Sequence, residues 1–287
     1  MSNCPYCGKN ANLFLKGSDI NRQVSTIEFR LMKCTHCGLI YIDNPPENIG
    51  EYYTNDYHQP KAIISSTDEI KLIILKSFKR KGKLLEIGSS CGSFSLIAKK
   101  SGFDVTTIEQ DINCVTHMQQ ELQINAIQSD MPQEILKNNE EKYDAICLWH
   151  CLEHLYKPWE VLEQATSHLE YNGILLVAVP NPESFFAKIL GNLWTHWDLP
   201  RHLFEFPISW MENFANKNNL DIEFVATRNF LHMNYESGSI GLLLKYLCPI
   251  KSLKPFVEKF GSKMGSFLKF KNSDKGSCYI IILRKQG

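Results

Sequence analysis

Four cysteines near the N-terminus form two copies of one short motif. Cys4 and Cys7 are separated by two residues, as are Cys34 and Cys37, and a glycine follows each pair. Two such pairs supply four thiolates, the ligand set of many tetrahedral structural zinc sites. Twenty-six residues separate the pairs, a little more than the roughly 15–20 usual for such sites. We therefore predict a structural Zn2+ site at these four cysteines; iron takes the same ligands and is an alternative.

Two other interpretations of the cysteines receive less support. A redox-active C-x-x-C pair is expected within a βαβ pattern, which we do not find in residues 1–45. Four surface thiols that happen to pair are the remaining alternative. A zinc ion would also explain how so short a module folds, because it adds the binding free energy that a small core lacks. We interpret His36 as a bystander between ligands.

The segment Glu86–Gly92 (Glu-Ile-Gly-Ser-Ser-Cys-Gly) is a second place where chemistry is expected. It links an apolar strand pattern to a helical pattern, and a glycine turn at such a junction lets backbone N–H groups approach a ligand. The carboxylate of Glu86 would repel a pyrophosphate but suits a ligand with a positive amino group and a sulfonium. The chain also lacks Gly-x-Gly-x-x-Gly, so a dinucleotide is not favoured.

Two further acids follow the next strand patterns. Glu109 ends the pattern Val105–Glu109, where a carboxylate can accept two hydrogen bonds from ribose hydroxyls. Asp130 follows the short apolar stretch Ile124–Ile127 and is within reach of an adenine amino group.

The elements that must position these residues alternate along the chain. Strand patterns alternate with helical patterns, which indicates a doubly wound, mostly parallel α/β sheet with right-handed crossovers. The expected strands are Lys83–Ile87, Val105–Glu109, Tyr143–Leu148 and Gly173–Val179. The expected helices are Gly92–Lys100, Asp111–Leu122 and Trp159–Leu169.

Composition changes along the chain divide it into three parts. Residues 1–45 form the zinc-ribbon-like module, closed by Asn44-Pro45-Pro46. Residues 46–80 form a linker with an aromatic patch (Tyr52, Tyr53, Tyr57) and a leading helix. Residues 81–287 form the α/β domain, with a basic amphipathic insertion at 229–272 before the last strand.

Several of these segments resemble successive motifs of the class I S-adenosylmethionine (SAM)-dependent methyltransferases. The motifs are Glu86–Gly92, Thr107–Glu109, Ser129-Asp130 and Leu148–His154, and the resemblance covers about residues 70–287. It implies a Rossmann-like seven-stranded sheet whose last strand, here Ser277–Arg284, runs antiparallel. It also implies SAM as cofactor, with Glu109 on the ribose and Asp130 near the adenine.

One position departs from the family pattern. The family loop usually carries three alternating glycines, and Ser90 replaces the middle one, so we expect looser packing around the methionine part of SAM. A doubly wound domain with another ligand or none is the alternative. The residues expected to hold SAM are Glu86, Gly88, Ser90, Gly92, Glu109, Asp130 and Trp149.

Candidate bases cluster in two segments that follow strands. Methyl transfer from a sulfonium depends on positioning, and an oxygen or nitrogen acceptor often needs a base as well. The first segment, Trp149–His154, supplies His150, Glu153 and His154. The second, Trp194–His202, supplies His202, and related methyltransferases carry a similar Trp…Pro-x-His-Leu segment. We expect the two segments to face each other across one pocket. Alternatively, the tryptophans of these segments pack in a core, and Arg201 pairs with an internal carboxylate.

Charge and hydropathy restrict the function classes. Lysine plus arginine equal aspartate plus glutamate, 31 against 31, so nucleic acid is not an expected partner. No apolar run reaches the roughly 18 residues of a membrane span, and no signal peptide is recognised. We expect a cytoplasmic protein whose ten cysteines are mostly thiols or metal ligands.

Residues 239–271 differ from the rest of the chain. They combine seven lysines and a single acid, Glu258, with apolar residues at helical spacing. Such a segment either packs on the enzyme core with its lysines in solvent, the interpretation we favour here, or makes peripheral contact with an anionic membrane.

We therefore predict a SAM-dependent methyltransferase that acts on a small or carrier-linked acceptor, such as a sugar or quinone-like molecule. The alternatives are a zinc-ribbon methyltransferase or binding protein that acts on RNA or protein, and a non-catalytic SAM-binding protein. Fold and cofactor do not fix the acceptor. The sequence does not give the oligomeric state.

Overall fold

The computed structural model describes residues 2–53, 61–227, 233–267 and 276–286. The chain forms two compact units, each assembled from three separate segments. We call one the ribbon unit; it comprises Met1–Tyr53, Pro180–Met211 and Ala226–Tyr279. We call the other the sheet unit; it comprises Thr54–Val179, Glu212–Val225 and Ile280–Gly287. The boundaries expected at 45/46 and 80/81 stay predictions.

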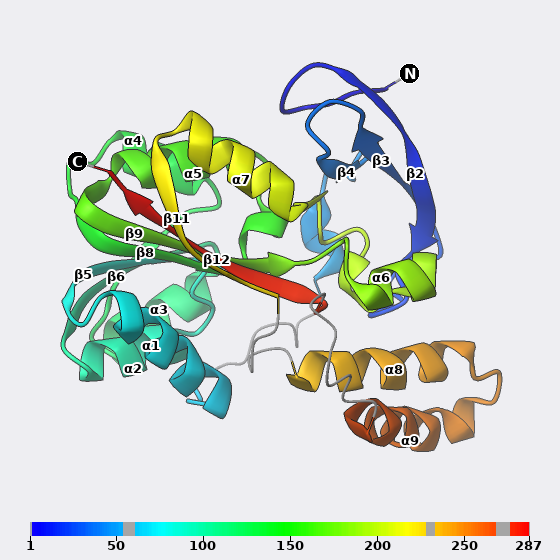
Figure 1. Ribbon diagram of the computed structural model, residues 1–287. Helices are drawn as coiled ribbons and strands as arrows, with labels where there is room; N and C mark the ends of the chain where they lie inside the picture. Colours follow the sequence, from blue (N-terminus) through cyan, green and yellow to red (C-terminus); the bar gives the residue numbers. More distant parts are fainter. Residues whose placement is uncertain (1, 54–60, 228–232, 268–275, 287) are drawn as a thin grey trace. The chain divides into compact units, whose positions relative to one another are not determined.

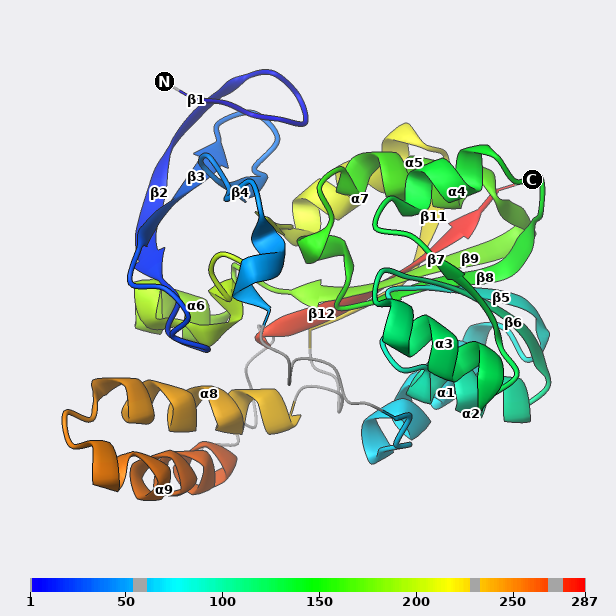
Figure 2. The same ribbon diagram turned by 180° about the vertical axis from the view of Figure 1, so that it is seen from behind.

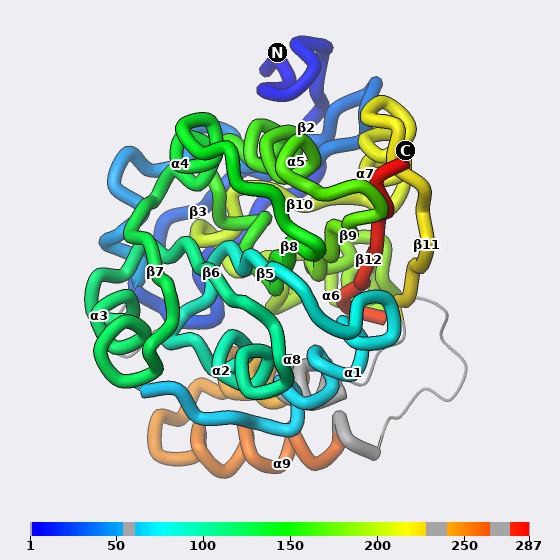
Figure 3. Tube along the Cα trace, turned by 90° about the vertical axis from the view of Figure 1, so that its left-hand side faces the viewer, coloured from blue at the N-terminus to red at the C-terminus, as the bar shows by residue number. Residues whose placement is uncertain are grey.

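The sheet unit is built on a seven-stranded sheet. Its strand order is β11-β12-β9-β8-β5-β6-β7, and Figure 3, viewed along the strands, shows them side by side from β7 to β11. The strands are β5 (Gly82–Ile87), β6 (Phe103–Glu109), β7 (Asn125–Gln128), β8 (Tyr143–Trp149), β9 (Leu169–Pro180), β11 (Leu220–Ala226) and β12 (Cys278–Lys285). β5 pairs in parallel with both β6 and β8, β6 with β7, and β8 with β9. The arrow of β12 runs opposite to that of β9 (Figure 1).

Helices cover both faces of this sheet. They are α1 (Ser66–Phe78), α2 (Ser93–Lys100), α3 (Ile112–Gln120), α4 (Pro132–Lys137), α5 (Pro158–Ser167) and α7 (Ile208–Lys217). Figures 1 and 2 show α1, α2 and α3 on one face and α4, α5 and α7 on the other. Because both faces are covered, the central strand β8 is apolar and buried almost throughout, with Ala145, Ile146, Cys147 and Leu148 fully buried. The predicted α/β fold with a seven-stranded, mostly parallel sheet is confirmed.

Local chemistry explains where α1 begins. Ser65 is its N-cap: the Ser65 hydroxyl accepts the Asp68 N–H, and the Asp68 carboxylate accepts the Ser65 N–H at 2.9 Å. This reciprocal pair satisfies two backbone donors that a helix start leaves without partners.

The ribbon unit contains a five-stranded antiparallel sheet. Its order is β1-β2-β3-β4-β10, from β1 (Ser2–Asn3), β2 (Asn10–Ser18), β3 (Glu28–Cys34), β4 (Ile40–Ile42) and β10 (Phe204–Glu205). β10 comes from a distant part of the chain and pairs with β4, with Phe204 opposite Tyr41 and Glu205 opposite Ile40.

Short helices and two buried tryptophans also belong to the ribbon unit. The helices are η1 (Ile49–Tyr52), α6 (Phe185–Leu190), η3 (Gly191–Leu193) and η4 (Thr195–Trp197). Trp194 and Trp197 are buried in one apolar cluster with Phe29, Leu31 and Ile42 of β3 and β4. The tryptophans are therefore core residues of this unit.

Two helices follow β11 in the chain. α8 (Met233–Leu247) and α9 (Lys254–Phe267), joined through η6 (Lys251–Leu253), lie side by side (Figures 1 and 2). A Cβ added to Gly261 would lie 2.9 Å from the Cα of Gly241, so the helices approach closely at these two glycines. In the part of the chain that the structure describes, no helix is long and apolar enough to cross a membrane. Tyr57 of the expected aromatic patch and residues 268–271 of the basic stretch lie outside the described residues.

Candidate functional site

The loop after β5 lies where the strand order of the sheet changes direction. β5 is flanked by β6 on one side and β8 on the other, and ligands of doubly wound sheets bind at the carboxyl edge of such a switch point. Gly88 has φ +74°, and an added Cβ would collide with the side chain of Cys151. Only glycine therefore allows the end of β5 to turn this closely past the segment that follows β8.

Ser90 and Glu109 are joined directly. Ser90 has φ +49°, in the left-handed region that glycine favours, and its N–H donates to the Glu109 carboxylate at 2.7 Å. The same carboxylate accepts the N–H groups of Gln110 at 2.8 Å and Asp111 at 3.0 Å. Glu109 is 4% exposed. It thus fixes the loop after β5 to the end of β6, and its predicted contact with a ribose stays a prediction.

Glu86 lies beneath this loop. Its carboxylate is buried and accepts a short hydrogen bond from the hydroxyl of Ser95 on α2. Burial raises the pKa of Glu86 to about 7, although the positive charge of Lys71 opposes the rise. A buried acid with so high a pKa can change its protonation state near neutral pH.

Lys71 on α1 is a residue that sequence reasoning missed. Its Nζ lies 5.5 Å from the ring centroid of Trp149 and 6.0 Å from that of Phe94, and 3.7 Å from the Asp68 carboxylate. A lysine on an amphipathic helix gives no sequence signal of this kind, because most such lysines are solvated.

Trp149 ends β8 and is 5% exposed. Its ring meets that of Phe94 edge-on, at 5.3 Å between centroids. Within the described residues its Nε1–H is buried and has no hydrogen-bond acceptor. Buried donors usually have partners, so this N–H is suited to an acceptor on a ligand.

Gly92 and Asp130 complete the predicted cofactor set. Gly92 has φ +80° and is the N-cap of α2, against Met118. Asp130 follows β7 and is exposed. Since β5, β6, β7 and β8 are parallel, the segments that follow them share one edge of the sheet. The structure thus brings all the predicted cofactor residues to the switch-point edge.

His150 and Glu153 form a pair just beyond β8. Nδ1 of His150 lies 3.3 Å from a carboxylate oxygen of Glu153, which is fully buried in η2 (Leu152–His154). The His150 backbone has φ +53° and donates its N–H to Ala178 at 2.9 Å, which holds the turn. A buried carboxylate on Nδ1 orients an imidazole. His154 is half-buried in the same turn.

His202 and Glu205 form a second pair of the same kind, within the ribbon unit. Nδ1 of His202 lies 3.2 Å from the Glu205 carboxylate, and Glu205 is 1% exposed on β10. Sequence reasoning missed Glu205. The repeated spacing His-x-x-Glu, present at 150–153 and 202–205, is the signal that could have found it.

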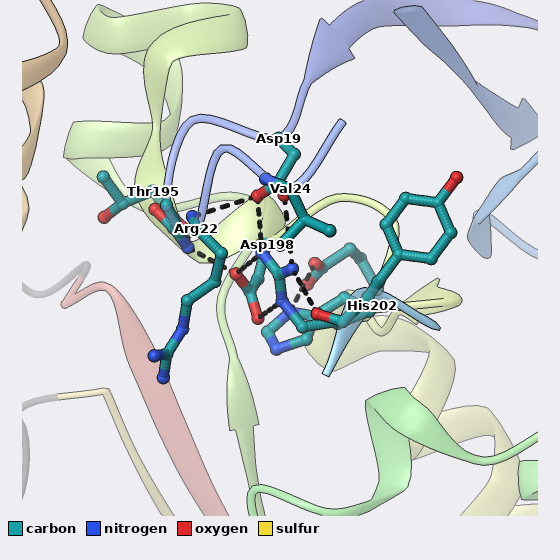
Figure 4. A network of polar contacts seen from close by, with 10 residues as sticks. Asp19, Arg22, Val24, Thr195, Asp198 and His202 are labelled. Atoms are coloured by element: carbon teal, nitrogen blue, oxygen red, sulfur yellow. Dashed lines mark hydrogen bonds and ion pairs between the residues drawn. The ribbon is translucent and has the colours of Figure 1, made fainter. Parts of the chain in front are cut away.

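Arg201, adjacent to His202, forms an internal ion-pair cluster. Its guanidinium is fully buried and bonds Asp19 at 2.7 Å, Asp198 at 2.8 Å and the carbonyl of Tyr52 at 3.1 Å. Asp19 in turn accepts the backbone N–H groups of Arg22 and Val24 (Figure 4). This cluster ties the loop after β2 to the segment after η4.

The four predicted metal ligands come together at one end of the ribbon sheet. The Sγ–Sγ distances are 3.7 Å for Cys4–Cys37, 3.5 Å for Cys7–Cys34 and 3.7 Å for Cys7–Cys37. Four sulfurs about 2.3 Å from a tetrahedral zinc would lie about 3.8 Å apart. The Cys34 sulfur also accepts the N–H groups of His36 and Cys37 at 3.4 Å, which fixes its position in the cluster. The spacing therefore fits a tetrahedral metal ion, and the imidazole of His36 does not belong to the cluster.

Comparisons with known proteins agree with this architecture. A family model described as "Methyltransferase domain" matches residues 57–224. Among curated proteins, none matches the chain.

Solved structures with a similar fold include three proteins of low sequence identity. A SAM-dependent methyltransferase from Archaeoglobus fulgidus is 20% identical, with a TM-score of 0.50 over 76% of this chain and 94% of that one. A putative sarcosine dimethylglycine methyltransferase from Galdieria sulphuraria is 12% identical, with a TM-score of 0.53 over 80% and 95%. A cyclopropane synthase from Mycobacterium tuberculosis is 13% identical, with a TM-score of 0.51 over 75% and 80%. At these identities the likeness concerns the fold alone.

Proposed function

The chain belongs to the methyltransferase-domain family, and from this premise we propose that it is a SAM-dependent methyltransferase of a small or carrier-linked acceptor. The single observation that carries the proposal is the family match over residues 57–224, which contains every residue predicted to hold the cofactor. The similar structures include an enzyme named as SAM-dependent, which supports the choice of cofactor.

The residues at the switch-point edge suit SAM chemically. We propose that the turn at Gly88 and Ser90 borders the methionine part of the cofactor. Glu109 and Asp130 would offer carboxylates to the ribose and adenine, and Trp149 its buried N–H. When bound, the cofactor supplies a methyl group on a positively charged sulfonium. The ionised form of Glu86 adds a compensating negative charge below the loop.

The protein's own part in the reaction is to position the acceptor and to receive its proton. We propose His150 as the base: its Nδ1 is held by Glu153, so Nε2 is the nitrogen that takes the proton. His154 lies in the same turn and is proposed to orient the acceptor. His202, held by Glu205, is the second candidate for the base.

Calorimetry with SAM and with its demethylated product, S-adenosylhomocysteine, tests the cofactor. The wild-type chain is expected to bind both. Glu109→Ala removes the carboxylate proposed to accept the ribose hydroxyls and should weaken binding by roughly 10–100-fold. Glu121→Ala, which removes an exposed acid directly after α3, is the matched control and should bind normally. No binding by a folded wild-type chain would refute the proposal.

Kinetics with an acceptor found by screening metabolite pools with labelled SAM test the base. His150→Ala or His202→Ala should lower kcat by about 10²–10⁴ at neutral pH. His36→Ala removes an exposed imidazole outside both pairs and is the control. Near-normal kcat in both variants would eliminate histidine as the base.

The same screen addresses the acceptor. The balanced charge of the chain does not favour a polyanion, so we propose a sugar or quinone-like molecule. We further propose that the four-thiol cluster holds a structural Zn2+, and that the enzyme is cytoplasmic. Metal analysis of the purified protein distinguishes zinc from iron.

A further inference from the structure

The helical hairpin of α8, η6 and α9 presents apolar side chains to solvent. On α9, Phe256, Phe260 and Met264 are 71%, 54% and 42% exposed. They are four residues apart, so they form one stripe along the helix. At the turn between the helices, Leu247, Ile250 and Leu253 are 55%, 52% and 46% exposed. Large apolar side chains are rarely gathered in this way on a surface that stays in water.

The stripe is separate from the residues through which α9 contacts α8. α9 meets α8 through Gly261, which approaches Gly241, and through Glu258, which pairs with Lys245 at 2.9 Å. The phenylalanines lie on another side of α9. The sequence-based expectation that this stripe packs on the enzyme core stays without support, because its side chains are exposed.

The charge next to the stripe is positive. Lys259 and Lys263 each precede a stripe residue by one position, so they run alongside it, and both are exposed. Lys251 is exposed at the turn. Glu258 is the single acid in residues 240–267, and Lys245 already neutralises it.

We propose that this face of the hairpin, made of Phe256, Phe260, Met264, the apolar turn and the flanking lysines, binds the surface of an anionic lipid membrane. The phenylalanines enter the boundary between headgroups and acyl chains, and the lysines meet the lipid phosphates. The helix lies on the membrane and does not cross it, in keeping with the absence of a spanning helix among the described residues. Charge complementarity selects this partner over an apolar protein groove. The inference does not depend on the methylation reaction.

Vesicle co-sedimentation of the full-length protein tests the proposal. One set of vesicles contains phosphatidylcholine alone, and the other contains equal parts of phosphatidylcholine and phosphatidylglycerol. We expect binding to the second set, and its loss at 1 M salt, where the Debye length falls to about 3 Å. Lys259→Glu/Lys263→Glu should weaken binding by about 20-fold or more, since each lysine contributes roughly fivefold. Phe256→Ser/Phe260→Ser should weaken it by about tenfold or more.

A matched control separates this face from general electrostatics. Lys81→Glu/Lys100→Glu makes the same charge change at exposed positions of the sheet unit and should leave binding within about twofold of wild type. Equal loss in the control would overturn the proposal, as would an unchanged partition of both hairpin variants. If the wild type ignores vesicles and light scattering shows a dimer that Phe256→Ser/Phe260→Ser dissociates, the face binds a second copy and the proposal is wrong.

Discussion

Each of the two units contains one β-sheet, and different interactions stabilise the two sheets. In the sheet unit the strands are covered by helices on both faces, and β8 and residues 173–180 of β9 are almost entirely buried. The ribbon unit combines a smaller apolar cluster with two local polar centres, the four thiols at one end of its sheet and the buried Arg201 cluster. A diffuse apolar core distributes stability over many side chains, whereas a metal or ion cluster concentrates it in a few. Single substitutions should therefore affect the ribbon unit most.

The largest expected effect is the loss of the four-thiol cluster. With one zinc ion bound, Cys37→Ser should lower the free energy of unfolding of the ribbon unit by at least about 5 kcal/mol, since structural zinc contributes roughly 10–16 kcal/mol in isolated peptides. Metal content and thermal melting measure this. Cys248→Ser, outside the cluster, is the control. Equal melting of Cys37→Ser and wild type would show that the thiols hold no structural metal.

The second-largest loss of stability is expected when the Arg201 cluster is disrupted. Burial would raise the pKa of Asp198, but the hydrogen bonds from Arg201 outweigh burial and hold that pKa well below its usual range. Arg201→Met leaves buried carboxylates without a cation and should cost about 3–5 kcal/mol at pH 7. Denaturant titration measures the loss, which should shrink as acid protonates the carboxylates.

An exposed ion pair in the sheet unit serves as the comparison. Arg284 bonds Glu223 at 2.7 Å near the end of β12, and Arg284→Met should cost about 1 kcal/mol or less. If the two arginine variants lose equal stability, the contrast between the units fails.

In the sheet unit, replacing the buried acid Glu86 is expected to raise the free energy of unfolding. The pKa of Glu86 is raised in the folded state from 4.5 to about 7, so the folded protein keeps a proton that the unfolded chain releases between these pH values. The free energy of unfolding therefore falls as pH rises from about 4.5 to 7 and levels off above. Glu86→Gln removes this fall and should be more stable than wild type at pH 8 by up to about 3 kcal/mol. Parallel pH profiles of stability for the two proteins would exclude this account.

The smallest expected effect concerns Ser90, whose φ of +49° suits glycine better. Ser90→Gly should stabilise the sheet unit by about 1 kcal/mol and tighten SAM binding. Gln123→Gly relieves a similar left-handed backbone, φ +54°, after α3, and should raise stability without changing SAM affinity. Equal SAM affinities in all three proteins would show that the serine does not limit the methionine pocket.

The sheet could be predicted because its signals are local. The patterns at Lys83–Ile87 and Tyr143–Leu148 each describe a few neighbouring residues, and the strands found extend them by one residue. The resemblance supplied the antiparallel last strand. The C-x-x-C spacing likewise predicted which four sulfurs meet.

The ribbon core could not be predicted in the same way. β10 pairs with β4 across more than 160 residues, and no local period specifies such a partner. For the same reason the sequence leaves two interpretations for Trp194 and Trp197, and it does not indicate that the Glu205 carboxylate lies beside His202. In the sheet unit, the contact between Lys71 and Trp149 could not be predicted either, because it depends on how α1 packs and not on the helical pattern of its residues.

The interleaving of the two units bears on synthesis of the chain. The ribbon strands β2, β3 and β4 leave the ribosome first, but Trp194 and Trp197, which complete their core, are made about 150 residues later. At about 5–20 residues per second this is a delay of roughly 8–30 s. The four thiols, by contrast, are complete once Cys37 has emerged. Metal capture can thus hold the nascent ribbon in register, and keep its apolar face from other chains, until its own tryptophans arrive.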